Sequence, residues 1–210
     1  MAMGTVSAAP MQSVGQTGRS APSSPSTPAQ FASQAADRTL GPSTPVQAST
    51  PAAAPASSPV LDWAQRQEGQ RVGSGECFDL ADQALRQNGM KTASDYGRVT
   101  PDADYRWGQA VPLNQSQPGD ILQFRNYENS TTQADGSGYD RDRPHHTAVV
   151  VGNDGHGNIT VLEQNAEPPE SPVTRRVLHF GNGQVQDENG NPTTQHTTGT
   201  TRAYRPQPRG

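Results

Sequence analysis

The spacing of hydrophobic residues predicts two helices between residues 59 and 88. Over residues 76–88 the apolar positions recur at intervals of three and four, which is typical of a helix with one buried face: Cys77, Leu80, Ala81, Ala84 and Leu85. A similar spacing predicts a shorter helix over 59–70, with a proline near its start. Gly73 and Gly75 separate the two helices and provide a flexible turn.

Strand patterns follow the helices. Short apolar or β-branched runs bounded by glycine, proline or asparagine predict strands over 121–124, 146–151, 159–163, 173–180 and 202–205. The glycine-rich segment 152–158 predicts a hairpin between the second and third of these. The polar segments 126–144 and 182–200 are expected to be long loops. Helices followed by antiparallel strands indicate an α+β fold, with the N-terminal helices packed on a small antiparallel β-sheet.

Composition divides the chain into two parts. The whole chain is only 30% hydrophobic and 5% aromatic, with a mean hydropathy of −0.84. Of its first 60 residues, 39 are Ala, Ser, Pro or Thr. Such a segment buries too little apolar surface to offset the entropy cost of ordering. We therefore expect residues 1–57 to form a disordered arm and residues 58–210 to form a single domain.

Charge and hydropathy also limit the classes of partner. The net charge is −4 and there is no run of basic residues, so nucleic acid is not an expected partner. No apolar stretch is long enough to span a membrane. Residues 1–16 lack the charged and apolar regions of a Sec signal peptide, which predicts either a cytoplasmic location or secretion by a leaderless route. The arm resembles the leaders of injected bacterial effectors in composition, although a plain linker would have the same composition.

Cys77 is the single cysteine of the chain and lies at the start of the second predicted helix. A helix N-terminus presents free N–H groups and a positive dipole, both of which favour the reactive thiolate. These features make Cys77 a candidate nucleophile. The alternative is a structural role, because a free cysteine is often a small buried hydrophobe.

The hairpin would bring a base and its supporting groups to one end of the sheet. His146 begins one strand, and Glu163 and Asn165 end the next. A cysteine hydrolase needs this combination of a thiol, an imidazole and a polar group that orients the imidazole. The alternatives are a solvated strand end for Glu163 and a turn position for Asn165.

Other polar and aromatic residues receive no role in chemistry. His145 and Gln164 are expected at the surface, because neighbouring side chains on a strand alternate in direction. Tyr105 and Trp107 either pack in the core or line a cleft, and Asp120 is expected to cap a turn. The remaining histidines lack partners at ligand spacing, so no metal site is expected: His156, His179 and His196.

Four landmarks together resemble the CHAP domains, which are cysteine, histidine-dependent amidohydrolases and peptidases in the papain-like, NlpC-type group. The landmarks are Gly75-Glu76-Cys77 at a helix start and the segments 117–124, 146–150 and 159–165. The resemblance covers roughly residues 70–166. It implies a papain-like fold in which Cys77 is the nucleophile, His146 the base, and Glu163 and Asn165 support the histidine. It also implies that the backbone N–H of Cys77 stabilises the oxyanion.

The same resemblance implies a reaction and a set of partners. CHAP domains typically cleave amide bonds of peptidoglycan, and their mechanism needs no metal or organic cofactor. A peptidoglycan peptide or another amide is then the substrate, and secretion machinery or an immunity protein are candidate partners. Two alternatives remain open: a papain-like protease or acyltransferase that acts on a protein, and a non-catalytic binding module on the same scaffold.

Overall fold

The computed structural model describes residues 58–167, 169–187 and 190–210. The chain divides into two units, Met1–Thr50 and Pro51–Gly210, and the described residues lie in the second. The arm expected over residues 1–57 lies outside the described residues. The elements, in chain order, are α1 (Pro59–Gln65), α2 (Cys77–Gln87), η1 (Ala93–Asp95), β1 (Gln109–Val111), η2 (Leu113–Gln115), β2 (Ile121–Gln133), β3 (Gly138–Asn153), β4 (Asn158–Glu163), β5 (Thr174–His179), β6 (Gly183–Gln186) and β7 (Pro192–Arg205).

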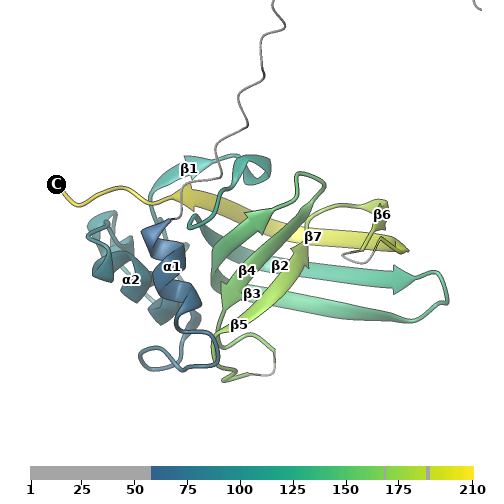
Figure 1. Cartoon of the computed structure of the whole chain (residues 1–210), viewed down its shortest axis with the longest axis horizontal. Helices are drawn as coiled ribbons and strands as arrows, with labels where there is room; N and C mark the ends of the chain where they lie inside the picture. Colours follow the sequence, from purple (N-terminus) through teal and green to yellow (C-terminus); the bar gives the residue numbers. More distant parts are fainter. Residues whose placement is uncertain (1–57, 168, 188–189) are drawn as a thin grey trace, which may run out of the picture. The chain divides into compact units, whose positions relative to one another are not determined.

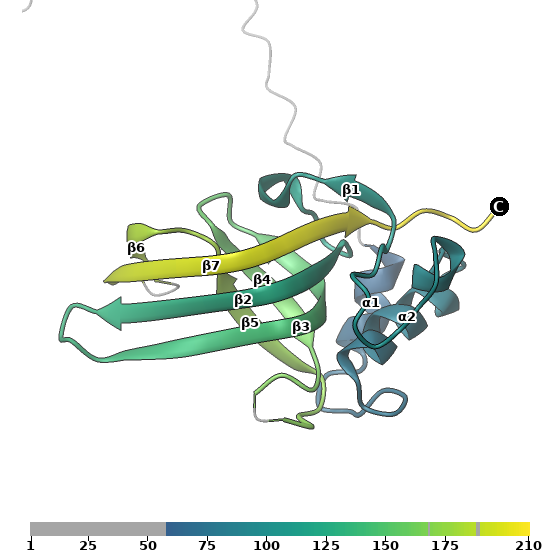
Figure 2. The same ribbon diagram turned by 180° about the vertical axis from the view of Figure 1, so that it is seen from behind.

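The strands form one seven-stranded antiparallel sheet. Its order is β1-β7-β2-β3-β4-β5, and β6 pairs with β7. The sheet curls, so that β4 and β5 cross over one face of the long β2, β3 and β7 ribbons (Figures 1 and 2). The Tyr127 hydroxyl closes this curl by donating to the His179 carbonyl at 2.8 Å. Both α-helices lie at one end of the sheet and pack against β3.

A bulge accompanies the curl. The pairing of β2 with β7 shifts in register between Arg125 and Glu128. Asn126 has a φ of 50° and Gly199, on the opposite strand, has a φ of 80°. A Cβ atom at Gly199 would lie 1.9 Å from the Asn126 carbonyl oxygen, so the two backbones approach as closely as they do because residue 199 is glycine.

The curled sheet separates two hydrophobic clusters. One lies under the helices and contains the predicted apolar stripe of α2, with Leu80, Ala81, Ala84 and Leu85 fully buried. The other lies on the opposite side of the sheet, inside the curl, and includes Phe124 and Tyr127. The site described below lies where the N-terminus of α2 meets the middle of β3 and the end of β4.

The expected fold class, helices packed on a small antiparallel sheet, is wrong, because the structure consists mostly of sheet. The sheet is large instead of small, and the two α-helices have only 7 and 11 residues. The predicted helix over 76–88 is confirmed as α2, but the helix from Pro59 ends at Gln65 instead of residue 70. Strands are present at all five predicted positions. The two predicted loops are the main error, because 126–144 and 182–200 largely extend β2, β3 and β7 and supply β6.

These extra strands have a buried face made of polar residues. Along β2 the alternate residues Tyr127, Asn129 and Thr131 are buried. Asn129 donates to the Thr197 hydroxyl at 2.9 Å and accepts from Thr131 at 2.9 Å, so the buried polar groups are satisfied in pairs. Every second residue along this part of β2 is therefore buried, but because several of these residues are polar, the hydropathy of the sequence does not reveal the alternation. Within the described residues, no helix has the length and apolar character needed to cross a membrane.

Candidate active site

Cys77 is the first residue of α2 and is half-buried. The side chain of the preceding residue, Glu76, makes no capping hydrogen bond to the first turn of the helix. The turn before the helix is tied to it by Asp79, whose carboxylate accepts from the backbone N–H of Ser74 at 2.7 Å. Gly73 and Gly75 have φ values of 60° and 100°, which let the chain turn directly into the helix.

His146 lies on β3 between the thiol and a carboxylate. Its side chain is buried, with the residue 4% exposed, and its Nε2 atom is 3.1 Å from Glu163 Oε2. Because Nε2 faces Glu163, Nδ1 is the atom available to Cys77. Burial disfavours the charged ring, but hydrogen bonds with Cys77 and Glu163 outweigh burial and raise the pKa of His146 to about 9. The imidazole is therefore stabilised as the cation that a thiolate partner requires.

Glu163 ends β4 and is fully buried, with 0% exposure. Burial alone would raise its pKa, but hydrogen bonds from His146 and Arg143 outweigh burial and lower the pKa to about 2. Arg143 forms a two-pronged ion pair with it, Nε to Oε2 at 3.0 Å and a terminal nitrogen to Oε1 at 2.6 Å. The Arg176 Nε atom lies 3.5 Å from Oε1. The carboxylate is thus held ionised and fixed in orientation.

Arg143 is the site residue that sequence reasoning missed. It is 1% exposed and lies within segment 126–144, which was expected to be a loop. A second carboxylate, Glu167, accepts from it at 2.7 Å, so the buried guanidinium is neutralised on two sides. Nothing in the local sequence distinguishes this arginine from its neighbours Arg141 and Arg125. Its position along β3 in the folded sheet is what brings its guanidinium to the Glu163 carboxylate.

Gln164 was expected at the surface, and this expectation is wrong. Its side chain is fully buried, with 0% exposure, and it ties the sheet to the turn before Cys77. Its amide accepts from the Val72 N–H at 3.0 Å, donates to the Val72 carbonyl at 2.9 Å, and donates to the Glu76 carbonyl at 2.7 Å. A trans peptide points its C=O and N–H in opposite directions. By holding the Glu76 carbonyl, Gln164 therefore turns the Cys77 N–H the other way, as an oxyanion donor requires.

The structure does not bring Asn165 to His146. Asn165 has a φ of 56°, a turn conformation that asparagine tolerates. Its amide nitrogen donates to the Glu76 carboxylate at 3.0 Å, and its oxygen accepts from the Glu170 N–H at 2.7 Å. Of the four candidate catalytic residues, Cys77, His146 and Glu163 are therefore adjacent, whereas Asn165 shapes the turn after β4.

A groove of about 530 Å³ opens at Cys77. One wall is apolar and formed by Phe78, Val99, Pro101 and Tyr105. The Phe78 and Tyr105 rings meet edge to face with centroids 5.0 Å apart, and both contact the buried Trp107. Trp107 is therefore a core residue, whereas Tyr105 both packs in the core and lines the groove.

His145 also lines this groove. It was expected at the surface, but it is half-buried, and its Nε2 atom is 2.8 Å from the Ala103 carbonyl. The ring therefore contributes an N–H to a backbone oxygen and forms part of the wall. No group of three or more potential metal ligands occurs within residues 58–210 outside the two short gaps.

The arrangement has the parts of a thiol active site. The nucleophile stands at a helix start, the imidazole is buried beside it, and a carboxylate–arginine pair orients the imidazole. Proton transfer from Cys77 Sγ to His146 would leave a thiolate facing the groove.

Comparison with known proteins agrees at the level of the fold. A family model described as the AIM3/BBC1 cysteine proteinase-fold domain matches residues 42–208. "Altered inheritance of mitochondria protein 3" from Debaryomyces hansenii is 33% identical over 118 residues, covering 50% of this chain and 12% of that protein. The chain therefore spans only a small part of the length of this relative. No solved structure is significantly similar to the chain.

Proposed function

Because the chain belongs to the family of AIM3/BBC1 cysteine proteinase-fold domains, we propose that it is a thiol-dependent hydrolase or acyltransferase that acts on an amide bond of a protein or peptide. One observation carries this proposal. His146 is buried between the Cys77 thiol and the Glu163 carboxylate, and Arg143 fixes that carboxylate from behind. A cysteine with a purely structural role would need none of these three partners.

We propose a role for each group of the site. In the resting pair the Cys77 proton has already passed to His146, so the thiolate Sγ attacks the substrate carbonyl carbon, and the Cys77 N–H stabilises the negative oxygen that forms. His146 then donates that proton to the leaving amine nitrogen as the C–N bond breaks, which leaves a thioester on Cys77. Water, or the amine of a second substrate, attacks the thioester and gives its proton to His146, and Cys77 leaves as the thiolate, which restores the ion pair with the imidazolium. Glu163 remains ionised throughout and keeps the imidazole in position.

A protein or peptide is the proposed substrate, in place of peptidoglycan. The peptidoglycan expectation came from the CHAP resemblance, and the family model that matches is AIM3/BBC1. The Debaryomyces hansenii relative is named for mitochondrial inheritance, which gives no support to cell-wall chemistry. An apolar wall beside the nucleophile suits the side chain of a peptide.

A non-catalytic binding module is the second candidate. The name of the Debaryomyces hansenii relative refers to inheritance of mitochondria and to no catalytic activity. In this alternative the groove at Cys77 would hold a peptide segment without cleaving it, and the thiol would be dispensable.

Alkylation of the folded chain tests the proposal. We expect iodoacetamide at pH 6.5 to modify Cys77 at least about tenfold faster than a free cysteine in a short peptide, because the ion pair with His146 maintains the thiolate. His146→Ala should remove this advantage, and His156→Ala, which alters an exposed histidine in the β3–β4 turn, should not. Intact mass spectrometry gives the rates. Labelling that is fast only after denaturation, or that is unchanged in His146→Ala, would refute the thiolate.

A peptide library then separates the two candidates. Cleavage or transfer that disappears in Cys77→Ser supports the enzyme. Peptide binding that survives in Cys77→Ser, with no turnover by the wild-type chain, supports the binding module.

A further inference from the structure

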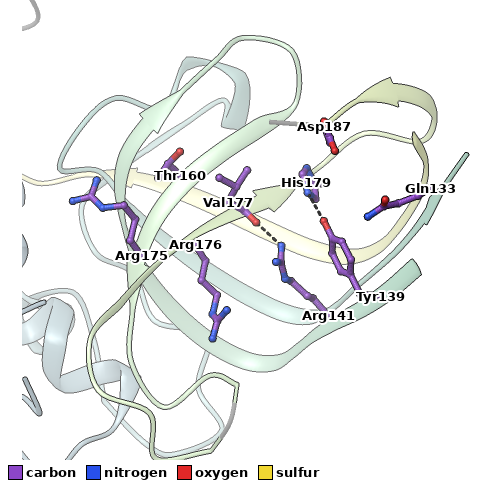
Figure 3. A pocket seen from close by; sticks show the side chains of 9 residues that line it. All are labelled: Gln133, Tyr139, Arg141, Thr160, Arg175, Arg176, Val177, His179 and Asp187. Atoms are coloured by element: carbon purple, nitrogen blue, oxygen red, sulfur yellow. Dashed lines mark hydrogen bonds between the residues drawn. The ribbon is translucent and has the colours of Figure 1, made fainter. Parts of the chain in front are cut away.

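A second cavity lies away from Cys77, between β5 and the far end of the β2–β3 hairpin. Its volume is about 410 Å³, within the usual range for small-molecule sites. Figure 3 shows the side chains that surround it. They are Gln133, Tyr139, Arg141, Thr160, Arg175, Arg176, Val177, His179 and Asp187.

Positive charge is concentrated in this cavity. Three arginines and one aspartate line it, although the chain as a whole carries a net charge of −4. Three of the four charged groups are engaged by other groups of the chain. Arg175 pairs with Glu68 at 2.9 Å, and the Asp187 carboxylate accepts from the Asn191 N–H at 2.8 Å. Arg176 extends toward Glu163 of the candidate active site, at 3.5 Å. Arg141 is therefore the cation best placed to meet a ligand.

The Arg141 guanidinium is held in a defined position. It lies over the Tyr139 ring at 4.6 Å from the centroid, and one terminal nitrogen donates to the Val177 carbonyl at 2.6 Å. Tyr139 is itself fixed, because its hydroxyl is 3.1 Å from His179 Nε2. His179 Nδ1 is 2.7 Å from Asn158 Oδ1, so the ring donates there and accepts the tyrosine proton at Nε2. This chain of contacts orients Arg141 before any ligand arrives.

We propose that this cavity binds a small phosphate monoester, with Arg141 as the main phosphate-binding group. An oriented guanidinium can donate two parallel hydrogen bonds to an oxyanion. Arg175 and Arg176 already face carboxylates of the chain, so Arg141 is the lining arginine whose positive charge favours an anionic ligand over a neutral one. The polar side chains of Gln133 and Thr160 supply further donors on the walls. The site is separate from the Cys77 groove, so this proposal does not depend on the proposed function.

Calorimetric titration of the full chain with inorganic phosphate and with O-phosphoserine, against serine and chloride at equal ionic strength, tests the site. We expect saturable binding of both phosphates and none of serine or chloride, with the monoester tighter. Arg141→Gln should weaken binding about tenfold or more, and Arg141→Lys should retain part of it. The matched control is Arg125→Gln, which removes an arginine paired with Asp104 outside the cavity.

Asp187→Asn keeps the proposal falsifiable if Arg141→Gln unfolds. Removing the negative charge from the lining should tighten phosphate binding, which loss of structure cannot mimic. The absence of saturable binding by either phosphate would overturn the site. So would equal weakening by Arg141→Gln and Arg125→Gln, or unchanged affinity in Asp187→Asn. Cys77→Ser should bind phosphate like the wild type, so this result is independent of the thiol chemistry.

Discussion

At the scale of single residues, the protonation state of the candidate site is set by the groups around Glu163. Arg143 and His146 bind both oxygens of this buried carboxylate and keep its pKa near 2. An ionised Glu163 in turn favours the imidazolium form of His146, whose pKa is raised to about 9. The thiol is therefore placed beside a cation at neutral pH.

This arrangement predicts that stability falls on the alkaline side. An unfolded histidine loses its proton near pH 6.5, whereas folded His146 keeps it until about pH 9. The His146 ring therefore binds more protons in the native state between these values, and its contribution to the free energy of unfolding decreases as pH rises through this window. The loss should be at most about 3 kcal/mol.

Urea denaturation at pH 6 and pH 10 measures this loss, and His146→Gln should show a flatter dependence. Cys77→Ser should lower the His146 pKa in an NMR titration, because one of its two hydrogen-bond partners changes. If the free energy of unfolding of His146→Gln fell with pH as steeply as that of the wild type, the loss of stability at alkaline pH would come from other groups.

Residue types and their order were sufficient to nominate Cys77, His146 and Glu163, which the structure places side by side. The same reasoning could not find Arg143, since an arginine in a polar segment has no local signature of burial. It also misplaced Gln164, because alternation predicts the direction of a side chain but not what covers that face.

At the scale of elements, the end of β4 connects the sheet to the turn before α2. Gln164 makes three hydrogen bonds to the backbone of that turn. These bonds fix the Glu76–Cys77 peptide relative to the strand that carries Glu163. The helix start and the triad carboxylate are thus positioned by consecutive residues.

Gln164→Ala should therefore reduce both stability and reactivity. Three backbone groups lose a buried partner, so we expect the free energy of unfolding to fall by about 3 kcal/mol. Alkylation of Cys77 should slow as well, because the turn is no longer held. Gln115→Ala, at an exposed glutamine in η2, is the control for chemical denaturation and should change little. If Gln164→Ala lost no more free energy of unfolding than this control, the hydrogen bonds of Gln164 to the turn would not contribute to stability.

Elements whose buried face is apolar could be predicted, as α2 and the start of β2 show. The far halves of β2, β3 and β7 could not, because their buried positions are filled by Asn129, Thr131 and Thr193. Asn129, for example, is hydrogen-bonded to Thr197 on the neighbouring strand, and that pairing exists only after the strands have met.

At the scale of the whole molecule, the curl of the sheet creates the enclosed cluster and the arginine-lined cavity. The curl brings the end of β5 against β2 and β3, as the bond from Tyr127 to the His179 carbonyl shows. The bulge at Asn126 and Gly199 lies in the ribbon that bends. The path of the long strands therefore depends on one close backbone approach.

Gly199→Ala should destabilise the fold strongly. Its Cβ would lie 1.9 Å from the Asn126 oxygen, whereas a Cβ at Gly136, in the β2–β3 turn, would meet nothing within 4 Å. Both glycines have positive φ, of 80° and 84°, so Gly136→Ala controls for the backbone cost of about 1 kcal/mol. We expect Gly199→Ala to lose at least about 2 kcal/mol more than this control in thermal or urea unfolding. Equal losses of stability in the two variants would mean that β2 and β7 can move apart at this position without a cost in free energy.

The adjacency of Glu163 and Gln164 has a consequence for folding. Successive side chains on a strand point to opposite faces, so pairing β4 one residue out of step would exchange the two. The amide would then face His146, and the carboxylate would face the Val72 carbonyl. In a mispaired molecule Glu163 would no longer stabilise the His146 imidazolium, and Gln164 would no longer hold the turn before α2. Thiol reactivity during refolding therefore reports correct strand alignment, and a single-residue insertion within β4 should silence the thiol even where the overall fold survives.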